Sequence, residues 1–218
     1  MRKVLWPIVV VVGILFSIEA GARTDFQYWN INEIEWKARE NWSLSVSEEL
    51  RFGGNVSRLY SHRTDIGLKY SGITDWLDIK AGYRQVFDRV GNRWKYENVP
   101  HFDGTLGMGL GGFKFSTRNR IEYRNREDRR NDWRYRNRLT AKRPFFFGTF
   151  EFAPYISDEI YLDCSKVGRI LRNRLSAGTE VKLLRYLVCD VYYMRQSTRG
   201  RSGWVDINVI GTKLKLAF

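Results

Sequence analysis

The chain has 218 residues, of which 37 are Lys or Arg and 24 are Asp or Glu, so its formal net charge is +13. This length suits one domain, since a single β-barrel commonly reaches about 200 residues. A basic chain of this kind could bind nucleic acid. Its basic residues alternate with aromatic ones instead of forming runs, however, and its N-terminus predicts export, so nucleic acid is excluded as the expected partner.

Residues 1–22 have the three parts of a cleaved signal peptide. Arg2 and Lys3 carry positive charge, an apolar stretch follows over residues 4–16, and Ala20-Gly21-Ala22 supplies the small residues that signal peptidase requires. The apolar stretch is shorter than the ~20 residues of a membrane-spanning helix, which disfavours an uncleaved anchor. We expect cleavage after Ala22, which leaves residues 23–218 as one mature domain.

Beyond the signal peptide, apolar and polar residues alternate with a period of two, which is typical of β-strands. In one example, Leu77, Ile79 and Ala81 alternate with Asp78 and Lys80. The predicted strands cover residues 26–40, 41–52, 58–71, 75–88, 93–109, 112–126, 132–143, 147–162, 168–182, 185–196 and 203–218.

The connections between these segments alternate between short and long. Tight turns lie near residues 39–41, 72–74, 110–111, 143–144 and 184, whereas longer, more charged loops cover residues 53–57, 89–92, 127–131, 163–167 and 197–202. Bacterial outer-membrane barrels have short turns in the periplasm and longer loops outside. The sequence therefore predicts an all-β fold, a transmembrane antiparallel up-and-down β-barrel.

The number of predicted segments conflicts with this architecture. Eleven were found, whereas single-chain bacterial barrels have an even number of strands and both termini in the periplasm. Residues 25–40 could hold two short strands separated near Asn30-Ile31-Asn32, which gives twelve strands, or one segment could lie outside the wall, which gives ten. We expect twelve.

The tryptophans give an independent indication of a membrane. Seven of the eight lie beyond residue 22, and most of these stand close to a predicted strand end. Trp favours the boundary between water and hydrocarbon, where its ring is buried and its N–H stays wet. A soluble periplasmic β-barrel binding protein with core tryptophans remains an alternative, but it does not explain why the tryptophans gather at strand ends.

The C-terminal segment, residues 204–218, has apolar residues at alternate positions and ends in Phe218. It resembles the last strand of bacterial outer-membrane β-barrel proteins, whose terminal aromatic residue is recognised by the barrel-assembly machinery. This resemblance implies location in the bacterial outer membrane, contact with its lipids, and a role for Phe218 as an assembly signal. Residues 25–52 are also similar to a subgroup known only as a domain of unknown function; the similarity rests on Tyr28-Trp29, Asn41-Trp42-Ser43-Leu44-Ser45 and Glu48-Glu49-Leu50-Arg51-Phe52. That subgroup implies location and architecture but no activity.

The sixth and seventh predicted strands carry many basic residues in one phase of the alternation. These residues are Lys114, Arg118, Arg120, Arg124, Arg126, Arg134, Arg136, Arg138 and Lys142. One Arg or Lys facing lipid near the bilayer midplane costs ~2–4 kcal/mol, so we expect them to line the interior or to stand above the membrane. Like charges so close repel unless water, anions or carboxylates compensate them. The acidic partners expected to do so are Glu122, Glu151, Glu159 and Glu180.

Two functions follow from a basic interior, and the sequence does not choose between them. The barrel could be a small pore that prefers anions, with small anionic solutes as its partners. It could instead be a structural barrel in which paired charges fill the interior.

No catalytic, cofactor-binding or metal site is predicted. The chain has two histidines. His101 shares a phase with Asp103 but with no serine, and His62 follows Ser61, so those two side chains point to opposite faces. An outer-membrane lipid-modifying hydrolase therefore remains an alternative without a recognisable motif. The two cysteines are expected to be unpaired.

Overall fold

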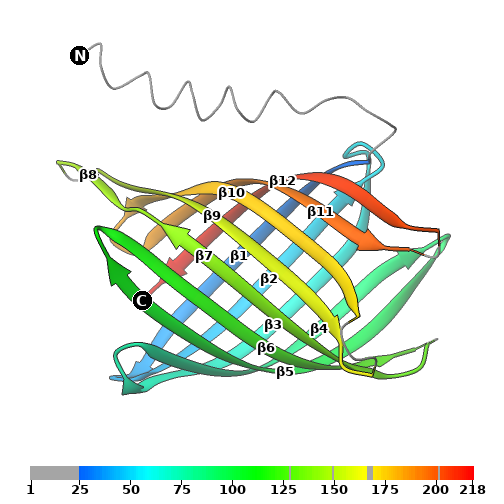
Figure 1. Ribbon diagram of the computed structural model, residues 1–218, viewed down its shortest axis with the longest axis horizontal. Coiled ribbons are helices and arrows are strands. Elements are labelled where there is room, and N and C mark those ends of the chain that lie inside the picture. The colour runs from blue at the N-terminus through cyan, green and yellow to red at the C-terminus, as the bar shows by residue number, and fades with distance from the viewer. Residues whose placement is uncertain (1–24, 128, 149, 166–168, 201) are drawn as a thin grey trace, which may run out of the picture.

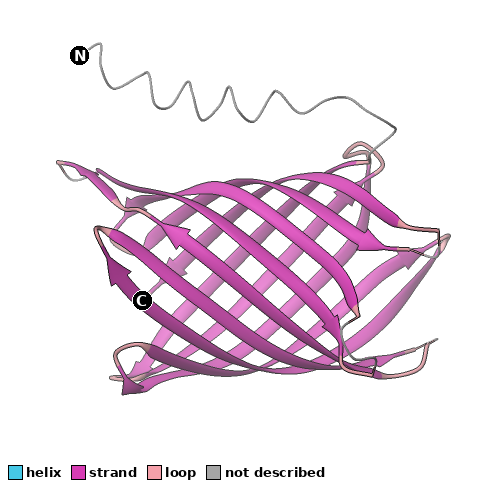
Figure 2. Ribbon diagram, viewed as in Figure 1, coloured by secondary structure: helices cyan, strands magenta, loops and turns pink. Residues whose placement is uncertain are grey.

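The computed structural model describes residues 25–127, 129–148, 150–165, 169–200 and 202–218. In these ranges the ordered elements are twelve β-strands (Figure 2). No helix that could cross a membrane occurs in the described part of the chain. The predicted signal peptide, residues 1–22, lies outside it.

Eleven of the strands lie side by side and close into a barrel (Figure 1). They are β1 (Phe26–Arg39), β2 (Trp42–Gly53), β3 (Arg58–Thr74), β4 (Leu77–Val90), β5 (Arg93–Leu110), β6 (Phe113–Arg126), β7 (Asp132–Lys142), β9 (Phe150–Asp163), β10 (Ile170–Leu184), β11 (Leu187–Arg199) and β12 (Trp204–Ala217). The remaining strand, β8 (Phe145–Phe147), pairs only with β9. The predicted fold class, an up-and-down β-barrel, is confirmed.

The closure of the barrel differs from the expectation of an even-stranded wall. Because each hairpin reverses the chain, an odd number of wall strands makes the first and last run the same way, and β1 pairs with β12 in parallel, from Phe26 opposite Asn208 to Glu35 opposite Ala217. As a result, Phe26 and Phe218 lie at opposite ends of the barrel. The two ends of the described chain therefore lie at opposite ends of the barrel, whereas the sequence predicts both termini on the periplasmic side.

The predicted division of residues 25–40 into two strands is wrong. β1 is continuous and pairs with β2 and β12 along its length. Asn30 and Asn32 do not break it, because their side chains find partners on the outer wall: the Asn30 amide donates to Thr212 Oγ1 at 3.0 Å, and the Asn32 amide donates to Asn30 Oδ1 at 2.8 Å. Their side-chain hydrogen-bonding needs are met without interrupting the ladder.

The twelfth strand has a different origin. β8 continues the line of β7 after a break at Arg143-Pro144, since Lys142 lies opposite Tyr155 and Phe145 opposite Phe152 on the same neighbour, β9. Proline has no backbone N–H, which suits it to the point where pairing with β6 ends. The β8–β9 hairpin consequently extends beyond the end of the wall (Figure 1).

The connections lie at two distinct ends. The turn end carries the β1–β2, β3–β4, β5–β6, β8–β9 and β10–β11 turns and the break between β7 and β8. The loop end carries the β2–β3, β4–β5, β6–β7, β9–β10 and β11–β12 connections together with the start of β1. In the β5–β6 turn, Gly111 and Gly112 have φ of +59° and +80°. Positive φ at both central residues is the type I′ geometry that joins twisted strands most tightly, and it favours glycine.

Side chains on both faces of the wall support the parallel seam between β1 and β12. Inside the barrel, four residues form the seam cluster: Glu33, Glu35, Lys213 and Lys215. Lys213 Nζ lies 2.7 Å from Glu33, and Lys215 contacts both glutamates. At the turn end the backbone of Phe218 is hydrogen-bonded to Glu35 and Lys37 of β1, at 3.0 and 2.8 Å. The last residue of the chain is thus part of the closure.

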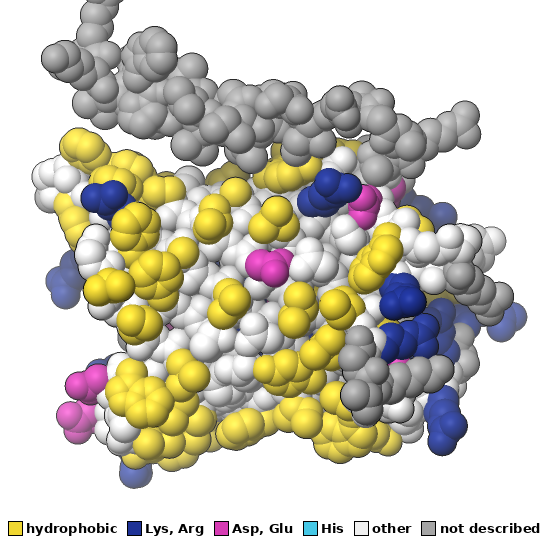
Figure 3. Space-filling view, viewed as in Figure 1, with side chains coloured by type: hydrophobic (Ala, Val, Ile, Leu, Met, Phe, Trp, Pro, Cys, Tyr) yellow, Lys and Arg dark blue, Asp and Glu magenta, His cyan; other side chains and the backbone are white. Residues whose placement is uncertain are grey.

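The two faces of the wall differ in polarity. Aliphatic and aromatic side chains are exposed on the outside, including six tryptophans near strand ends: Trp36, Trp42, Trp76, Trp94, Trp133 and Trp204. Figure 3 shows apolar side chains spread over the wall and basic ones gathered toward the loop end. Trp29 is the exception to the predicted position of tryptophan at the boundary. It points inward, is buried, and packs against Met194 and Val209.

Candidate functional site: a basic vestibule above an ion-paired layer

A layer of buried charged side chains crosses the interior of the barrel. Its centre is Glu159 on β9, which is 1% exposed. The carboxylate of Glu159 lies 2.7 Å from Arg118, 2.8 Å from Arg136, 3.0 Å from Arg138 and 3.5 Å from Arg174. These arginines come from β6, β7 and β10, so one carboxylate links β9 to three other strands.

A second group of acids continues the layer toward β3, β4 and β5. Glu122 is fully buried and is contacted by Arg134 and, at 2.7 Å, by Arg136. Asp103 accepts two hydrogen bonds from Arg120 at 2.5 and 2.6 Å. Glu122 and Asp103 therefore each pair with at least one arginine of β6 or β7, the strands that carry the predicted basic residues.

His101 lies within this second group, between two aspartates. Its Nε2 is 3.1 Å from Asp65, and its Nδ1 is 3.6 Å from Asp103. The ring occupies the space next to Gly82, where a Cβ would come within 2.3 Å of His101 Cε1. Glycine at this position makes room for the imidazole against the wall.

Aromatic rings complete the layer. The Tyr161 ring has four guanidinium groups around it, those of Arg134, Arg136, Arg172 and Arg174, at 5.2, 4.5, 5.4 and 5.0 Å from its centre. The Trp29 ring is covered by Arg51 at 3.4 Å. Such contacts stabilise a guanidinium that has been removed from water.

A cavity of about 230 Å³ lies on the loop-end side of this layer, and we call it the vestibule. Its lining reaches Val90, the last residue of β4, and Arg129 in the β6–β7 loop. Ten of its lining residues are Lys or Arg: Arg63, Arg84, Lys95, Arg124, Arg126, Arg129, Arg134, Arg136, Arg172 and Arg174. Two are acidic, Asp88 and Glu97.

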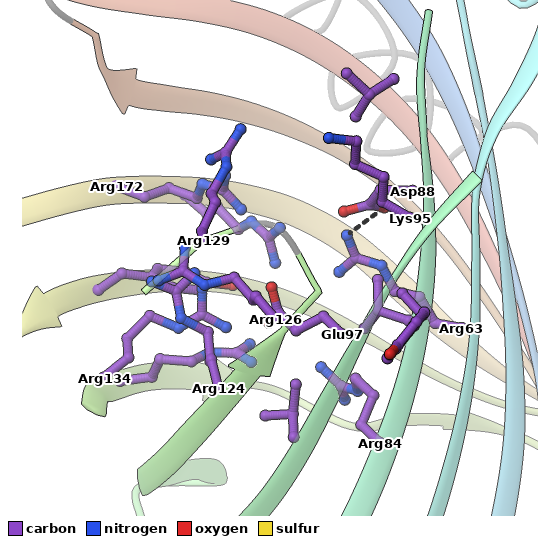
Figure 4. Close-up of a pocket in the computed structure, with 17 residues that line it drawn as sticks. Arg63, Arg84, Asp88, Lys95, Glu97, Arg124, Arg126, Arg129, Arg134 and Arg172 are labelled. Carbon is purple, nitrogen blue, oxygen red and sulfur yellow. Dashed lines mark ion pairs between the residues drawn. The ribbon is translucent and has the colours of Figure 1, made fainter. Parts of the chain in front are cut away.

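The vestibule has two unlike sides (Figure 4). Arg124, Arg134 and Arg172 stand on one side, from β6, β7 and β10. On the other side stand Asp88 of β4, which pairs with Arg63 at 3.6 Å, and Glu97 of β5. The arginine side contributes no acidic residue to the cavity lining, although Arg124 pairs with Asp132 and Arg134 with Glu122 behind it.

Several of the arginines lack a full set of partners among the described residues. Arg172 donates to Thr198 Oγ1 at 3.2 Å and has no carboxylate within ion-pair distance there. Arg124 and Arg126 share one acid, Asp132, at 2.7 and 2.5 Å. The Nε atoms of Arg126 and Arg136 are buried without an acceptor. Unmet donors beside a cavity are suited to binding an anion.

A second cavity, of about 310 Å³, lies on the turn-end side of the layer, and we call it the lower chamber. Its charged lining is nearly balanced, with five basic residues (Lys69, Lys80, Arg118, Arg120, Lys215) and four acidic ones (Glu33, Glu35, Asp78, Asp103). No residue lines both cavities. The buried layer therefore separates two polar compartments of different charge.

The structure places the nine predicted basic residues along the inside of β6 and β7, from the vestibule to the turn end. Arg124, Arg126, Arg134 and Arg136 line the vestibule, and Arg118 and Arg120 line the lower chamber. Arg138 contacts Glu159, Lys142 lies 2.8 Å from Glu180, and Lys114 stands opposite Lys142.

The predicted acids divide into two kinds. Glu122, Glu159 and Glu180 contact members of the basic group, as the preceding distances show. Glu151 instead lies 3.5 Å from Lys182 of β10. It does not reach the basic strands.

Several residues of the site were missed by the sequence reasoning. They are Trp29, Asp65, Asp103, Asp132, Tyr161, Arg172 and Arg174. The alternation in their strands already assigned them to one face, which is the signal that could have included them. Which of them meet depends on strand register, because only register brings Arg172 opposite Tyr161.

In the described part of the chain both histidines contact carboxylates. His62 contacts Glu48 at 2.5 Å on the outer wall, whereas Ser61 is buried inside. No group of three or more His, Cys, Asp or Glu in the described part of the chain could hold a metal ion. Cys164 and Cys189 are free.

Comparisons with known proteins identify the family and the fold. Residues 26–206 match the family described as "Protein of unknown function (DUF2490)". LpxR from Salmonella typhimurium has a similar structure, with a TM-score of 0.50 and 11% identity over 81% of this chain and 83% of LpxR. The NanC porin structure gives a TM-score of 0.49 and 9% identity over 85% of this chain and 95% of NanC.

At such low identity the likeness to LpxR concerns the fold alone, a closed β-barrel. No curated protein sequence matches the chain significantly. The family match covers most of the chain, from the start of β1 into β12. The chain therefore belongs to the DUF2490 family.

Proposed function

We propose that this protein is an integral outer-membrane β-barrel with a narrow lumen that admits small anions in preference to cations. The supporting observation is the charge of the vestibule, in which ten basic lining residues stand against two acidic ones. A cavity of one sign with low-dielectric walls concentrates ions of the opposite sign. Anions are therefore drawn to the loop end of the lumen.

The outer surface supports a position in the membrane. Exposed large apolar side chains cover the wall between the two ends, among them Ile66, Leu139, Ile156 and Leu175. A soluble protein rarely exposes apolar surface on this scale. With the longer loops outside, as is usual for bacterial barrels, the vestibule opens to the exterior and the lower chamber to the periplasm.

The basic strands offer a path past the ion-paired layer. Arginines follow one another from Arg134 and Arg136 at the vestibule to Arg120 and Arg118 at the lower chamber. To cross the layer, an anion must displace the carboxylates that now contact these arginines. Because ion pairs must open for each passage, we expect a low conductance.

The test is the conductance of the refolded barrel in a planar bilayer. Under a salt gradient, the sign of the reversal potential reports whether anions or cations carry the current. We expect anion preference in the unmodified protein. Replacing Arg129 and Arg172, which line the vestibule without a carboxylate partner among the described residues, by Glu should reduce or reverse it.

The matched control replaces Arg89, near the end of β4, and Arg199, at the end of β11, by Glu. It makes the same change in charge at the loop end, and neither residue lines the vestibule. An equal effect of the control would assign the preference to general surface charge. Cation preference in the unmodified protein, or no conductance at all, would overturn anion passage and favour a structural barrel.

Assembly should depend on Phe218. Its backbone completes the seam with β1, and its ring stacks on Tyr186 with the ring centres 6.1 Å apart. We propose that the barrel-assembly machinery recognises this residue. Phe218→Ser should lower the amount of assembled protein in outer membranes more than Ala217→Ser, and equal amounts of the two variants would contradict it.

A further inference from the structure

The β8–β9 hairpin carries an unusual concentration of phenylalanine at the turn end. We call Phe145, Phe146, Phe147, Phe150 and Phe152 the phenylalanine ribbon. Phe152 stacks with Phe145 and Phe147 at ring-centre distances of 5.3 and 5.9 Å. Phe146, on the opposite face of the hairpin, is 68% exposed. The ribbon therefore presents aromatic surface to its surroundings on both faces.

The backbone of the ribbon limits where it can lie. β8 pairs with β9 alone, so its other edge has no strand beside it. An unpaired strand edge is not tolerated in the hydrocarbon core, because nothing there accepts or donates hydrogen bonds. Exposed phenylalanine rings, in turn, are unfavourable in water. Both requirements are met at the level where lipid headgroups join acyl chains.

One basic side chain stands in this aromatic surface. The guanidinium of Arg143 lies 5.0 Å from the centre of the Phe113 ring and 5.3 Å from that of Phe145. Arg143 is exposed and has no carboxylate partner among the described residues. Figure 3 shows a basic side chain surrounded by apolar ones at the corner where Figure 1 places β8.

The geometry points to a binding site for an anionic phospholipid, with the headgroup phosphate on Arg143 and an acyl chain along the phenylalanine ribbon. Arginine matches phosphate with two parallel N–H donors, and the two rings hold its plane in place. An anionic lipid also neutralises a charge that no described side chain compensates. The inference rests on the proposed membrane location but not on anion passage through the lumen.

The test is lipid retention by the full barrel. The protein is reconstituted into vesicles of phosphatidylethanolamine and phosphatidylglycerol, extracted in detergent, and analysed by native mass spectrometry for bound phosphatidylglycerol. Loss of a charge-assisted contact to phosphate should weaken binding about tenfold in Arg143→Gln. Arg143→Lys keeps the charge but not the planar fork, so it should retain part of the binding.

The matched control is Arg185→Gln, since Arg185 is an exposed arginine in another turn at the same end. Each variant is first checked for the shift in gel mobility on boiling that marks a folded barrel. Failure of all forms to fold in the membrane would count against the membrane location itself. With folded protein, equal retention by Arg143→Gln and the unmodified chain, or an equal loss in Arg185→Gln, would overturn the site.

Discussion

Glu159→Gln is the change that most directly tests the ion-paired layer. It removes one negative charge while keeping nearly the same shape and an oxygen that can still accept from Tyr161, whose hydroxyl now donates to Glu159 at 3.0 Å. Four guanidinium groups within 3.5 Å lose the carboxylate that they share. We expect a large loss of stability.

The magnitude follows from the geometry and from the behaviour of other buried ion pairs. With an effective dielectric constant of about 20, two unit charges at 4 Å attract by ~4 kcal/mol, so four contacts represent a gross attraction of roughly 16 kcal/mol. Repulsion among the arginines and the cost of burying the carboxylate offset much of it. Removing one partner of a buried pair typically costs ~3–5 kcal/mol, which is the loss we expect here.

The assay is urea unfolding of the refolded barrel, followed by the gel mobility of unboiled samples. The matched control is Glu151→Gln, because Glu151 is partly exposed and its single ion pair, to Lys182, is 3.5 Å long. Exposed pairs contribute ~0–1 kcal/mol, so the control should be nearly neutral. A Glu159→Gln loss no greater than that of Glu151→Gln would refute the reasoning and would mean that water or bound anions already compensate these arginines.

Three further changes test other parts of the fold. Gly211→Ala should destabilise the barrel, because a Cβ there would lie 2.0 Å from the Tyr192 ring. Gly104→Ala should be tolerated, because a Cβ there meets nothing within 4 Å. The two variants are compared by the temperature at which unboiled samples lose the gel mobility of the folded barrel. Charge reversal of both glutamates of the seam cluster should lower the same stability. Reversal of both lysines as well should restore it only in part, because Lys69, which lies 2.7 Å from Glu35, would then face a lysine. Burial and the neighbouring Asp163 carboxylate raise the pKa of the Cys164 thiol. Its labelling by maleimide should therefore be slow at pH 7, and the rate should keep rising above the pH at which labelling of an ordinary thiol levels off. Rapid labelling at pH 7 would contradict a raised pKa.

Most of the wall could be predicted from the sequence, because each strand has an apolar outer face and a polar inner face. This arrangement imposes a period of two that is visible in the chain, and the predicted segment 75–88 corresponds to β4 over Leu77–Val90. The prediction failed where a strand lacks this contrast between its two faces. Phe145, Phe146 and Phe147 are apolar without alternation, because the ribbon lies beyond the wall, and Pro144 resembled an ordinary turn.

The closure and the site were harder to predict for a different reason. Alternation assigns a residue to a face but does not say which residue lies opposite it. The inward positions of β10 could be recognised, yet the meeting of Arg172 and Arg174 with Tyr161 and Glu159 depends on a register that shifts between Ile170 and Arg172. Parallel closure is likewise a property of the whole wall, and no single strand carries a sign of it.

The composition of the ion-paired layer bears on why these charges are inside the barrel at all. Buried ion pairs add little to stability, and well-packed apolar side chains of similar volume often serve as well or better. Stability alone therefore does not account for the layer. Nor does mutual neutralisation, because three carboxylates, those of Asp103, Glu122 and Glu159, are in contact with six guanidinium groups. These belong to Arg118, Arg120, Arg134, Arg136, Arg138 and Arg174. The excess positive charge lies next to the vestibule, where Arg129 and Arg172 have no carboxylate partner among the described residues. An excess of this kind is costly in an isolated interior. On the proposed function, an anion that enters the lumen would relieve it, and the stability of the layer would then depend on occupancy of the lumen.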